Sequence, residues 1–159
     1  MLRVERRATQ GTASDVLSLP YDQRKRSRLR ARTERGLEVA VVLPRGSVLR
    51  DGDLLAADSG EVLVVRAAAE SVSDAIAKDA TALARAAYHL GNRHVALQVE
   101  AGRLRYLHDH VLDAMLRELG LEVVVGVGAF EPEGGAYGGA HGHEHEHAHE
   151  HEHAHERRS

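Results

Sequence analysis

The last part of the chain has a composition suited to metal binding. Histidine occurs at every second position in HGHEHEHAHEHEHAHE, and most of the spacers are glutamates, whereas a purification tag is usually an unbroken run. Neutral imidazole is the commonest protein ligand for borderline divalent metals, and with a reference pKa of about 6.5 it is mostly neutral near pH 7. We therefore predict a metal-binding tail with eight candidate ligands: His141, His143, His145, His147, His149, His151, His153 and His155.

The tail is not expected to have a fixed structure. It lacks any large apolar residue that would offset the entropy of ordering, and a Gly-rich linker precedes it, so residues 135–159 are predicted to be disordered. Period-two spacing aligns side chains in an extended chain and scatters them around a helix. Geometry normally distinguishes one first-row metal from another, and a flexible chain imposes little of it. We expect a site of high capacity and low selectivity that accepts Ni(II), Zn(II) or Cu(II).

Other histidines occur in the part of the chain expected to fold. His108 and His110 flank Asp109, where a helix is predicted to begin; two imidazoles and a carboxylate can chelate one ion, and two surface histidines are the open alternative. The helix dipole disfavours a cation there, so such a site would exchange readily. His94 is isolated, and one imidazole is a poor site unless a two-fold axis brings its copy beside it. We interpret His89, in the last turn of a helix, as structural.

No catalytic motif accompanies these histidines. H-E-x-x-H, P-loop and G-x-S-x-G patterns do not occur, and Asp109 and Asp113 are explained as helix-capping or surface residues, so we do not expect an enzyme. The sequence contains no cysteine, which excludes disulfides, thiolate zinc sites and iron–sulfur clusters. Any bound metal must accept nitrogen and oxygen ligands.

Charge and hydropathy argue against nucleic-acid and membrane partners. The chain has a net charge of −3, and the tail, with five glutamates and two arginines, also has −3, so residues 1–139 are balanced. The basic run at 24–32 has arginines at alternate positions, as on the solvent face of a strand. No apolar run approaches the roughly 20 residues needed to span a bilayer, and MLRVERRATQG lacks the apolar stretch of a signal peptide. We expect a soluble, cytoplasmic protein.

Short strands are predicted for the first part of the chain. The candidate strands are LRVERR, SRLRART, LEVAVVL, DLLAAD and GEVLVVRA, with turn signals at 44–46 and 51–53 and no helical period among them. Hydrophobic residues make up 43% of the chain and aromatic residues 3%, so the core must consist of Val, Leu, Ile and Ala. We predict a small β-rich domain over residues 1–68.

The pattern changes after residue 68. SVSDAIA fits a strand or a first helical turn, and we predict a strand; Asp79 is the expected N-cap of a helix that ends at Gly91. HVALQVE, in which His94 begins the strand, and LRYLH predict a hairpin. DHVLDAMLREL predicts a helix between Asp109 and Gly120, and LEVVVGVGAF predicts a buried strand. The apolar face of this helix is predicted to consist of Val111, Leu112, Met115, Leu116 and Leu119.

These elements give the order β-α-β-β-α-β over residues 69–134, which is the ferredoxin-like arrangement. The predicted fold class is therefore α+β: a β-rich N-terminal domain, a ferredoxin-like C-terminal domain and a disordered histidine-rich tail.

Several strings resemble the UreE family of urease accessory proteins, which are nickel metallochaperones. They are ARAAYHLGNRHVALQV and LRYLHDHVLDAMLRELGLEVVVGVGAFEPEGGAYGG, together with SRLRART and LPRGSVLRDGDLL, and they cover about residues 15–139. The stretch ESVSDAIAKDAT departs from the family pattern. The resemblance implies an N-terminal domain similar to a chaperone peptide-binding module and a ferredoxin-like C-terminal domain that dimerises.

The resemblance also implies roles for particular residues. His94 matches the histidine that holds nickel between two subunits, and His108 and His110 match a secondary, peripheral metal site of some members; the tail is assigned by its chemistry alone. We therefore predict a homodimer that carries Ni(II) as cargo to the urease apoenzyme, with urease accessory proteins including the nickel-handling GTPase as partners. Two alternatives remain: a passive Ni or Zn buffer, and a peptide-binding scaffold whose dimerisation is regulated by metal.

Overall fold

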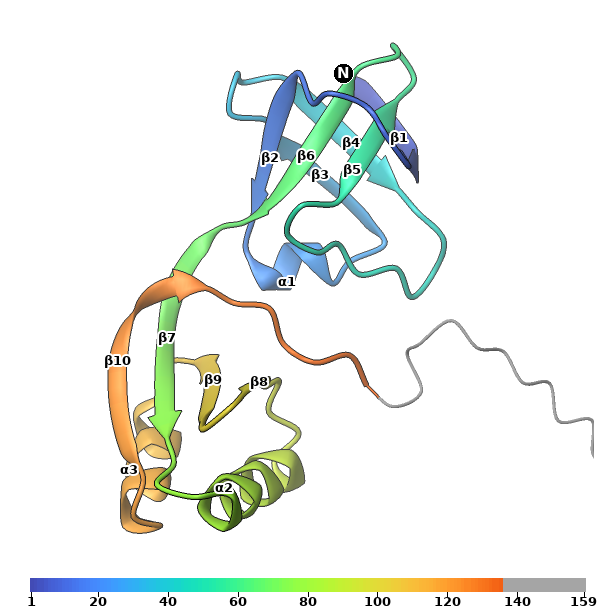
Figure 1. Ribbon diagram of the computed structural model, residues 1–159. Helices are drawn as coiled ribbons and strands as arrows, with labels where there is room; N and C mark the ends of the chain where they lie inside the picture. Colours follow the sequence, from blue (N-terminus) through green and yellow to red (C-terminus); the bar gives the residue numbers. More distant parts are fainter. Residues whose placement is uncertain (136–159) are drawn as a thin grey trace, which may run out of the picture.

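The computed structural model describes residues 1–135, and the eight tail histidines lie outside them. Within this range the elements form two sheets, one above the other in Figure 1. No helix among these residues is long and apolar enough to cross a bilayer. The N-terminal elements are β1 (Leu2–Arg7), β2 (Asp15–Leu19), α1 (Tyr21–Arg24), β3 (Arg28–Arg32), β4 (Glu38–Val42), β5 (Leu54–Ala57) and β6 (Val62–Ala67).

The N-terminal strands form a six-stranded sheet in the order β2-β6-β5-β1-β4-β3. β1 pairs with β4 and β2 pairs with β6 in parallel, and the other neighbours are antiparallel. All five predicted strands are present, and their core consists of Val, Leu and Ala side chains, as expected. The strand β2 and the four-residue helix α1 were not predicted. For α1 the reason is its length, since a single helical turn is too short to show a helical period.

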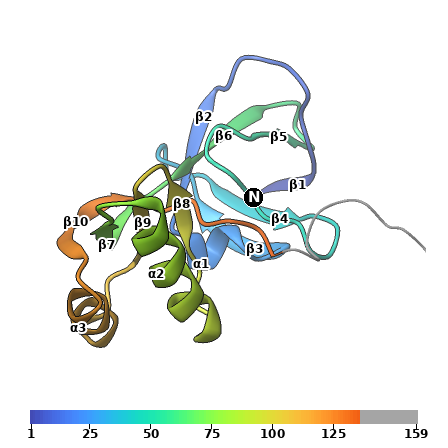
Figure 2. The same cartoon turned by 60° about the horizontal axis from the view of Figure 1, so that its bottom comes forward.

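The C-terminal elements follow the predicted order β-α-β-β-α-β. They are β7 (Ala69–Ile76), α2 (Ala80–Asn92), β8 (Gln98–Glu100), β9 (Arg103–Leu107), α3 (His110–Glu118) and β10 (Glu122–Ala129). The sheet order is β10-β7-β9-β8, with every neighbouring pair antiparallel. Residues of both helices pack with strand residues in one apolar cluster, so both helices cover the same face of the sheet (Figure 2).

Three details of the C-terminal prediction were wrong. The strand predicted at 121–130 is not buried: β10 is an edge strand that extends beyond the helices, so Val127 is 77% exposed although Val123 is buried. The predicted strand HVALQVE is reduced to Gln98–Glu100. On α3, Val111 is 54% exposed, because the buried stripe instead includes Asp113.

The two sheets are joined at two places. β6 continues into β7 through the single residue Ala68, and residues 130–133, after β10, return toward α1 (Figure 1). The Arg24 side chain is fully buried and donates hydrogen bonds to the carbonyls of Leu19 and Leu49 on its own side. It also donates to the carbonyl of Phe130 and to the carboxylate of Glu131.

Residues 130–133 contact both halves of the molecule. On the N-terminal side, the Phe130 ring meets that of Tyr21 edge to face at 5.4 Å, and Arg50 donates to the carbonyl of Pro132 at 2.7 Å. On the C-terminal side, the backbone N–H of Glu131 donates to the Gln98 side chain at 2.9 Å, and that of Glu133 to the carbonyl of Leu97 at 2.6 Å. This segment therefore fixes the position from which the remaining chain departs.

Replacement of Arg24 tests how much this junction contributes to stability. Arg24→Met leaves several buried acceptors and the Glu131 carboxylate without their donor, so we expect the free energy of unfolding to fall by about 3–5 kcal/mol. The measurement is urea unfolding of both proteins. The control is Arg26→Met, which removes an exposed ion pair to Asp22 and should cost less than about 1 kcal/mol. Equal costs for the two variants would contradict the structural importance of the buried guanidinium.

Candidate metal site

His94 is positioned by the end of helix α2. Asp79 caps the start of this helix, as predicted, by accepting a hydrogen bond from the N–H of Ala82 at 2.7 Å. At the other end, the N–H of His94 donates to the carbonyl of Gly91 at 3.0 Å, and that of Val95 to the carbonyl of Leu90 at 3.2 Å. This pair of bonds is the Schellman motif, with His94 at its left-handed C′ position.

The prediction that the helix ends at Gly91 was therefore wrong. Gly91 is helical, and His94 has a φ of 56°, the only positive φ of a non-glycine residue among residues 1–135. Left-handed backbone costs a non-glycine residue roughly 1–2 kcal/mol. The cost is accepted because Val95 and Leu97 pack on the apolar cluster and fix the path of the chain after the helix. The His94 side chain is exposed, so this hydrogen-bonded turn presents an imidazole at the surface.

His108 lies where β9 ends, and its ring is held by the core. Its backbone N–H donates to the carbonyl of Ser71 at 3.1 Å. Its Nδ1 atom lies 3.0 Å from Oδ2 of Asp113 and 3.1 Å from Oγ of Ser73. Although Nδ1 faces buried groups, the side chain is 36% exposed, so the opposite edge of the ring reaches solvent.

Asp113 is the residue that sequence reasoning missed. It is buried, and its Oδ1 accepts a hydrogen bond from the hydroxyl of Tyr106 at 2.6 Å. Burial and the neighbouring Asp113 carboxylate raise the pKa of Tyr106 well above its ordinary value, so the hydroxyl stays protonated and donates. The earlier interpretation of Asp113 as a capping or surface residue was wrong. No local signal marked Asp113, because its burial and its partners depend on how α3 packs beside Tyr106 and His108.

His110 and Asp109 form the start of α3. Asp109 caps the helix, as predicted, and accepts from the N–H of Val111 at 2.8 Å and of Leu112 at 3.3 Å. His110 is the first helical residue, and its side chain is exposed. Gly120 ends the helix with a φ of 89°, also as predicted.

The structure does not bring His94, His108 and His110 into one group. Within residues 1–135, no group of three or more His, Asp or Glu side chains is placed to hold a metal ion. A metal ion at any one of these histidines would therefore need ligands beyond those that residues 1–135 bring together. His89, in contrast, lies in the last turn of α2 with its ring against that of Tyr88, in agreement with a structural role.

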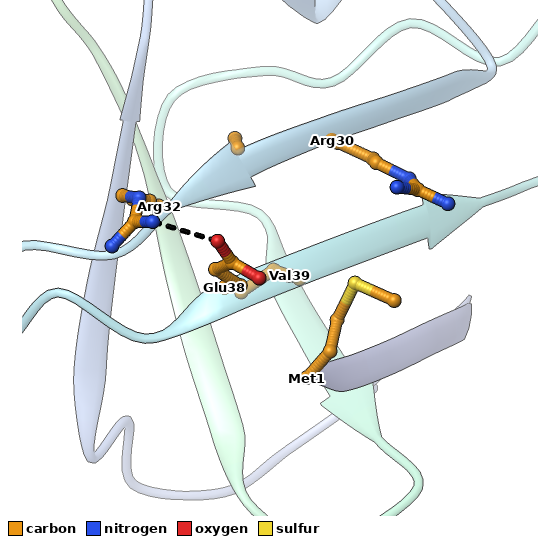
Figure 3. A pocket seen from close by; sticks show the side chains of 6 residues that line it. Met1, Arg30, Arg32, Glu38 and Val39 are labelled. Carbon is orange, nitrogen blue, oxygen red and sulfur yellow. Dashed lines mark hydrogen bonds and ion pairs between the residues drawn. The ribbon is translucent and has the colours of Figure 1, made fainter.

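The N-terminal half contains a surface hollow of a different chemical kind. It has a volume of about 240 Å³ and lies over β3 and β4 beside Met1 (Figure 3). The exposed Arg30 and Arg32 line it, in the alternating pattern predicted for this strand, and Arg32 pairs with Glu38 at 2.6 Å. Because its one carboxylate is paired and no histidine lines it, this hollow is not a candidate metal site.

Comparisons with known proteins agree along both halves of the chain. Residues 3–68 match the family described as UreE urease accessory protein, N-terminal domain, and residues 70–156 match the corresponding C-terminal domain. A urease accessory protein UreE of Alkalilimnicola ehrlichii is 57% identical over 139 residues, which cover 87% of this chain and 85% of the relative. Those of Proteus mirabilis and Vibrio parahaemolyticus are 52% and 54% identical over 123 residues; each alignment covers 77% of this chain, and 76% and 77% of the two relatives.

The matches define a two-domain accessory protein of urease. The chain belongs to the UreE family, and the resemblance inferred from the sequence strings is confirmed.

The left-handed backbone of His94 gives a testable consequence. We expect His94→Gly to raise the free energy of unfolding by up to about 1 kcal/mol, because glycine avoids the left-handed cost and loses only part of the gain to its greater chain entropy. The control is His89→Gly, the same change inside α2, which should lower the free energy of unfolding by roughly 0.3–0.5 kcal/mol, the difference between the helix propensities of histidine and glycine. Urea unfolding without metal measures both, and a similar loss in the two variants would refute the conformation assigned to His94.

Proposed function

We propose that this protein is a nickel carrier that binds Ni(II) through histidines and delivers it to apo-urease during urease maturation. The observation that carries the proposal is that His94 is an exposed imidazole on a hydrogen-bonded turn in a chain of the UreE family. Imidazole nitrogen is a suitable ligand for Ni(II). An accessory role, rather than catalysis, is also what the family description supports.

The proposed carrier is a homodimer. One His94 ring supplies one ligand, and a two-fold axis that passes close to it supplies a second. The exposed valines of β10 support self-association, since apolar surface of this kind is usually covered by a partner. We assign the C-terminal half to the ferredoxin-like arrangement, because its fourth strand lies beside the first and its second at the far edge. We also propose that the β-rich domain spans residues 1–68 and the ferredoxin-like domain residues 69–134.

The tail has a collecting role in this proposal. Its eight histidines bind ions weakly and exchange them quickly, and they complete the coordination of an ion held by the His94 pair. Glu133 is bonded to Leu97, three residues after His94, and the eight residues from Glu133 to His141 span up to about 27 Å when extended. Transfer from tail to core is therefore effectively intramolecular.

Delivery in the cytoplasm completes the proposed function. Free Ni(II) competes poorly with Cu(II) for nitrogen ligands, so a dedicated protein route replaces selection by affinity. We propose that contact with urease and its accessory proteins, including the nickel-handling GTPase, releases the ion.

The alternative is a passive Ni or Zn buffer. It is favoured by the absence, within residues 1–135, of a complete group of metal ligands, which leaves the tail as the richest source of them. Carrier and buffer differ in whether the folded part holds a nickel ion of its own.

Equilibrium dialysis against Ni(II) separates these two functions. The proteins are the full chain, a truncation after Gly139, and that truncation with His94→Ala or, as a matched control, His89→Ala. We expect the truncated dimer to keep a single tight ion, shared by two His94 rings, that His94→Ala abolishes and His89→Ala retains. Loss of all tight binding with the tail would instead support the buffer.

Delivery itself is tested by activation of apo-urease with its accessory proteins. The nickel-loaded full chain should raise urease activity above that given by the same concentration of nickel in a histidine-rich peptide copied from residues 141–156, and it should be captured by urease or the GTPase. Equal activation by the peptide, with no capture, would identify a buffer.

A further inference from the structure

We infer that Asp113, supported by Tyr106, positions His108 as a metal ligand by fixing which nitrogen of its ring carries the proton. The inference rests on the proposed nickel-binding function and adds two positioning residues, neither of which contacts the metal. Both were outside the predicted set of site residues, and both are buried.

The polar contacts of the ring indicate which nitrogen carries the proton. An ionised carboxylate has only lone pairs to offer, and Asp113 Oδ2 would repel a lone pair on His108 Nδ1 at 3.0 Å, so the neutral ring is favoured with its proton on Nδ1. The Ser73 hydroxyl, 3.1 Å from Nδ1, can accept from that proton. The Tyr106 hydroxyl donates to Oδ1 of the same carboxylate at 2.6 Å and holds it in place. With the proton on Nδ1, the other ring nitrogen, Nε2, carries the lone pair that a metal needs.

Differences in burial show which edge of the His108 ring faces the core. Tyr106 and Ser73 are fully buried and Asp113 is 2% exposed, whereas the His108 side chain is 36% exposed. The Nδ1 edge therefore faces the core, and the Nε2 edge faces solvent. A histidine that ligates a metal commonly donates its other N–H to a carboxylate, which fixes the tautomer and the ring orientation. Here that carboxylate is in place before any ion binds.

His108 differs in this respect from the other two candidate ligands of the folded part. Within residues 1–135, neither His94 nor His110 has a polar contact for its ring, whereas the His108 ring has a hydrogen bond with Ser73 and a contact of 3.0 Å with the Asp113 carboxylate. A single preoriented imidazole holds an ion weakly, so further ligands have to complete the site. His108 is thus the fixed ligand, and the ligands added to it are the exchangeable ones.

Ring nitrogen NMR of the full chain tests the inference, first without metal. We expect His108 to be protonated on Nδ1 in the wild-type protein. In Asp113→Asn, the amide oxygen keeps the bond from Tyr106 and the amide NH₂ turns to Nδ1, so the proton should move to Nε2. A folded backbone spectrum is the condition for interpreting the variant, and the wild-type measurement tests the tautomer without it. A proton on Nε2 in the wild-type protein overturns the inference.

Excess Ni(II), added as a simple salt beyond the capacity of the tail, tests the consequence for binding. The apparent affinity at His108, followed by paramagnetic broadening of its ring signals, should fall about 10–100-fold in Asp113→Asn, while broadening at His94 is unchanged. Glu118→Gln removes one negative charge at an exposed position of α3 and should leave both sites as in the wild type.

The outcomes distinguish this inference from the proposed function. Equal broadening at His108 in the wild type and Asp113→Asn overturns the inference, as does nickel that reaches His94 but never His108; in both cases the carrier proposal stands. Absence of nickel at His94 counts against the carrier proposal, whatever happens at His108.

Discussion

The two halves of the molecule depend on one buried guanidinium. Removal of a charged group from water costs several kcal/mol unless its hydrogen bonds are replaced, and Arg24 replaces them with carbonyls of its own half and with the carbonyl of Phe130 and the carboxylate of Glu131. The last two acceptors are present only when residues 130–131 lie against α1. A buried charge in the N-terminal half is therefore stable only in the presence of the end of the C-terminal half, and this makes the two folds interdependent.

On the proposed function, the same junction favours transfer of metal from the tail. Because Glu131 and Glu133 also bond to Gln98 and Leu97, the segment that precedes the tail is held beside the loop that follows His94. A tail that left the protein from a mobile linker would spend most of its time far from this loop. When the departure point is fixed beside this loop, the effective concentration of tail imidazoles at the loop rises. The increase is set by the length of the linker and needs no new contact.

What the sequence could predict was largely local. Strand alternation and the caps Asp79 and Asp109 depend on a few neighbouring residues and were correct, as was Gly120. The end of α2 was misplaced because the packing of Val95 and Leu97, and not the glycine, decides where the helix stops. The role of Asp113 required knowledge that β9 places Tyr106 and His108 beside α3, and the exposure of β10 required knowledge of how far the helices extend. Each of these depends on contacts between elements. Membership of the UreE family was predictable from the strings around His94 and His108.

On the proposed function, the protein must bind nickel and also lose it, and the arrangement of the folded histidines suits both needs. A complete coordination shell within one rigid chain would bind tightly and exchange slowly. Here the turn at His94 fixes the backbone that carries one imidazole, the Asp113 carboxylate contacts another at His108, and the part of the chain that the structure describes holds no group of three metal ligands. On the proposed function, the missing ligands come from a second copy or from the tail. Withdrawal of one such ligand when urease proteins dock then weakens the site without any change in the fold. Incomplete sites on rigid supports therefore give a defined position for the ion together with a low barrier to its release.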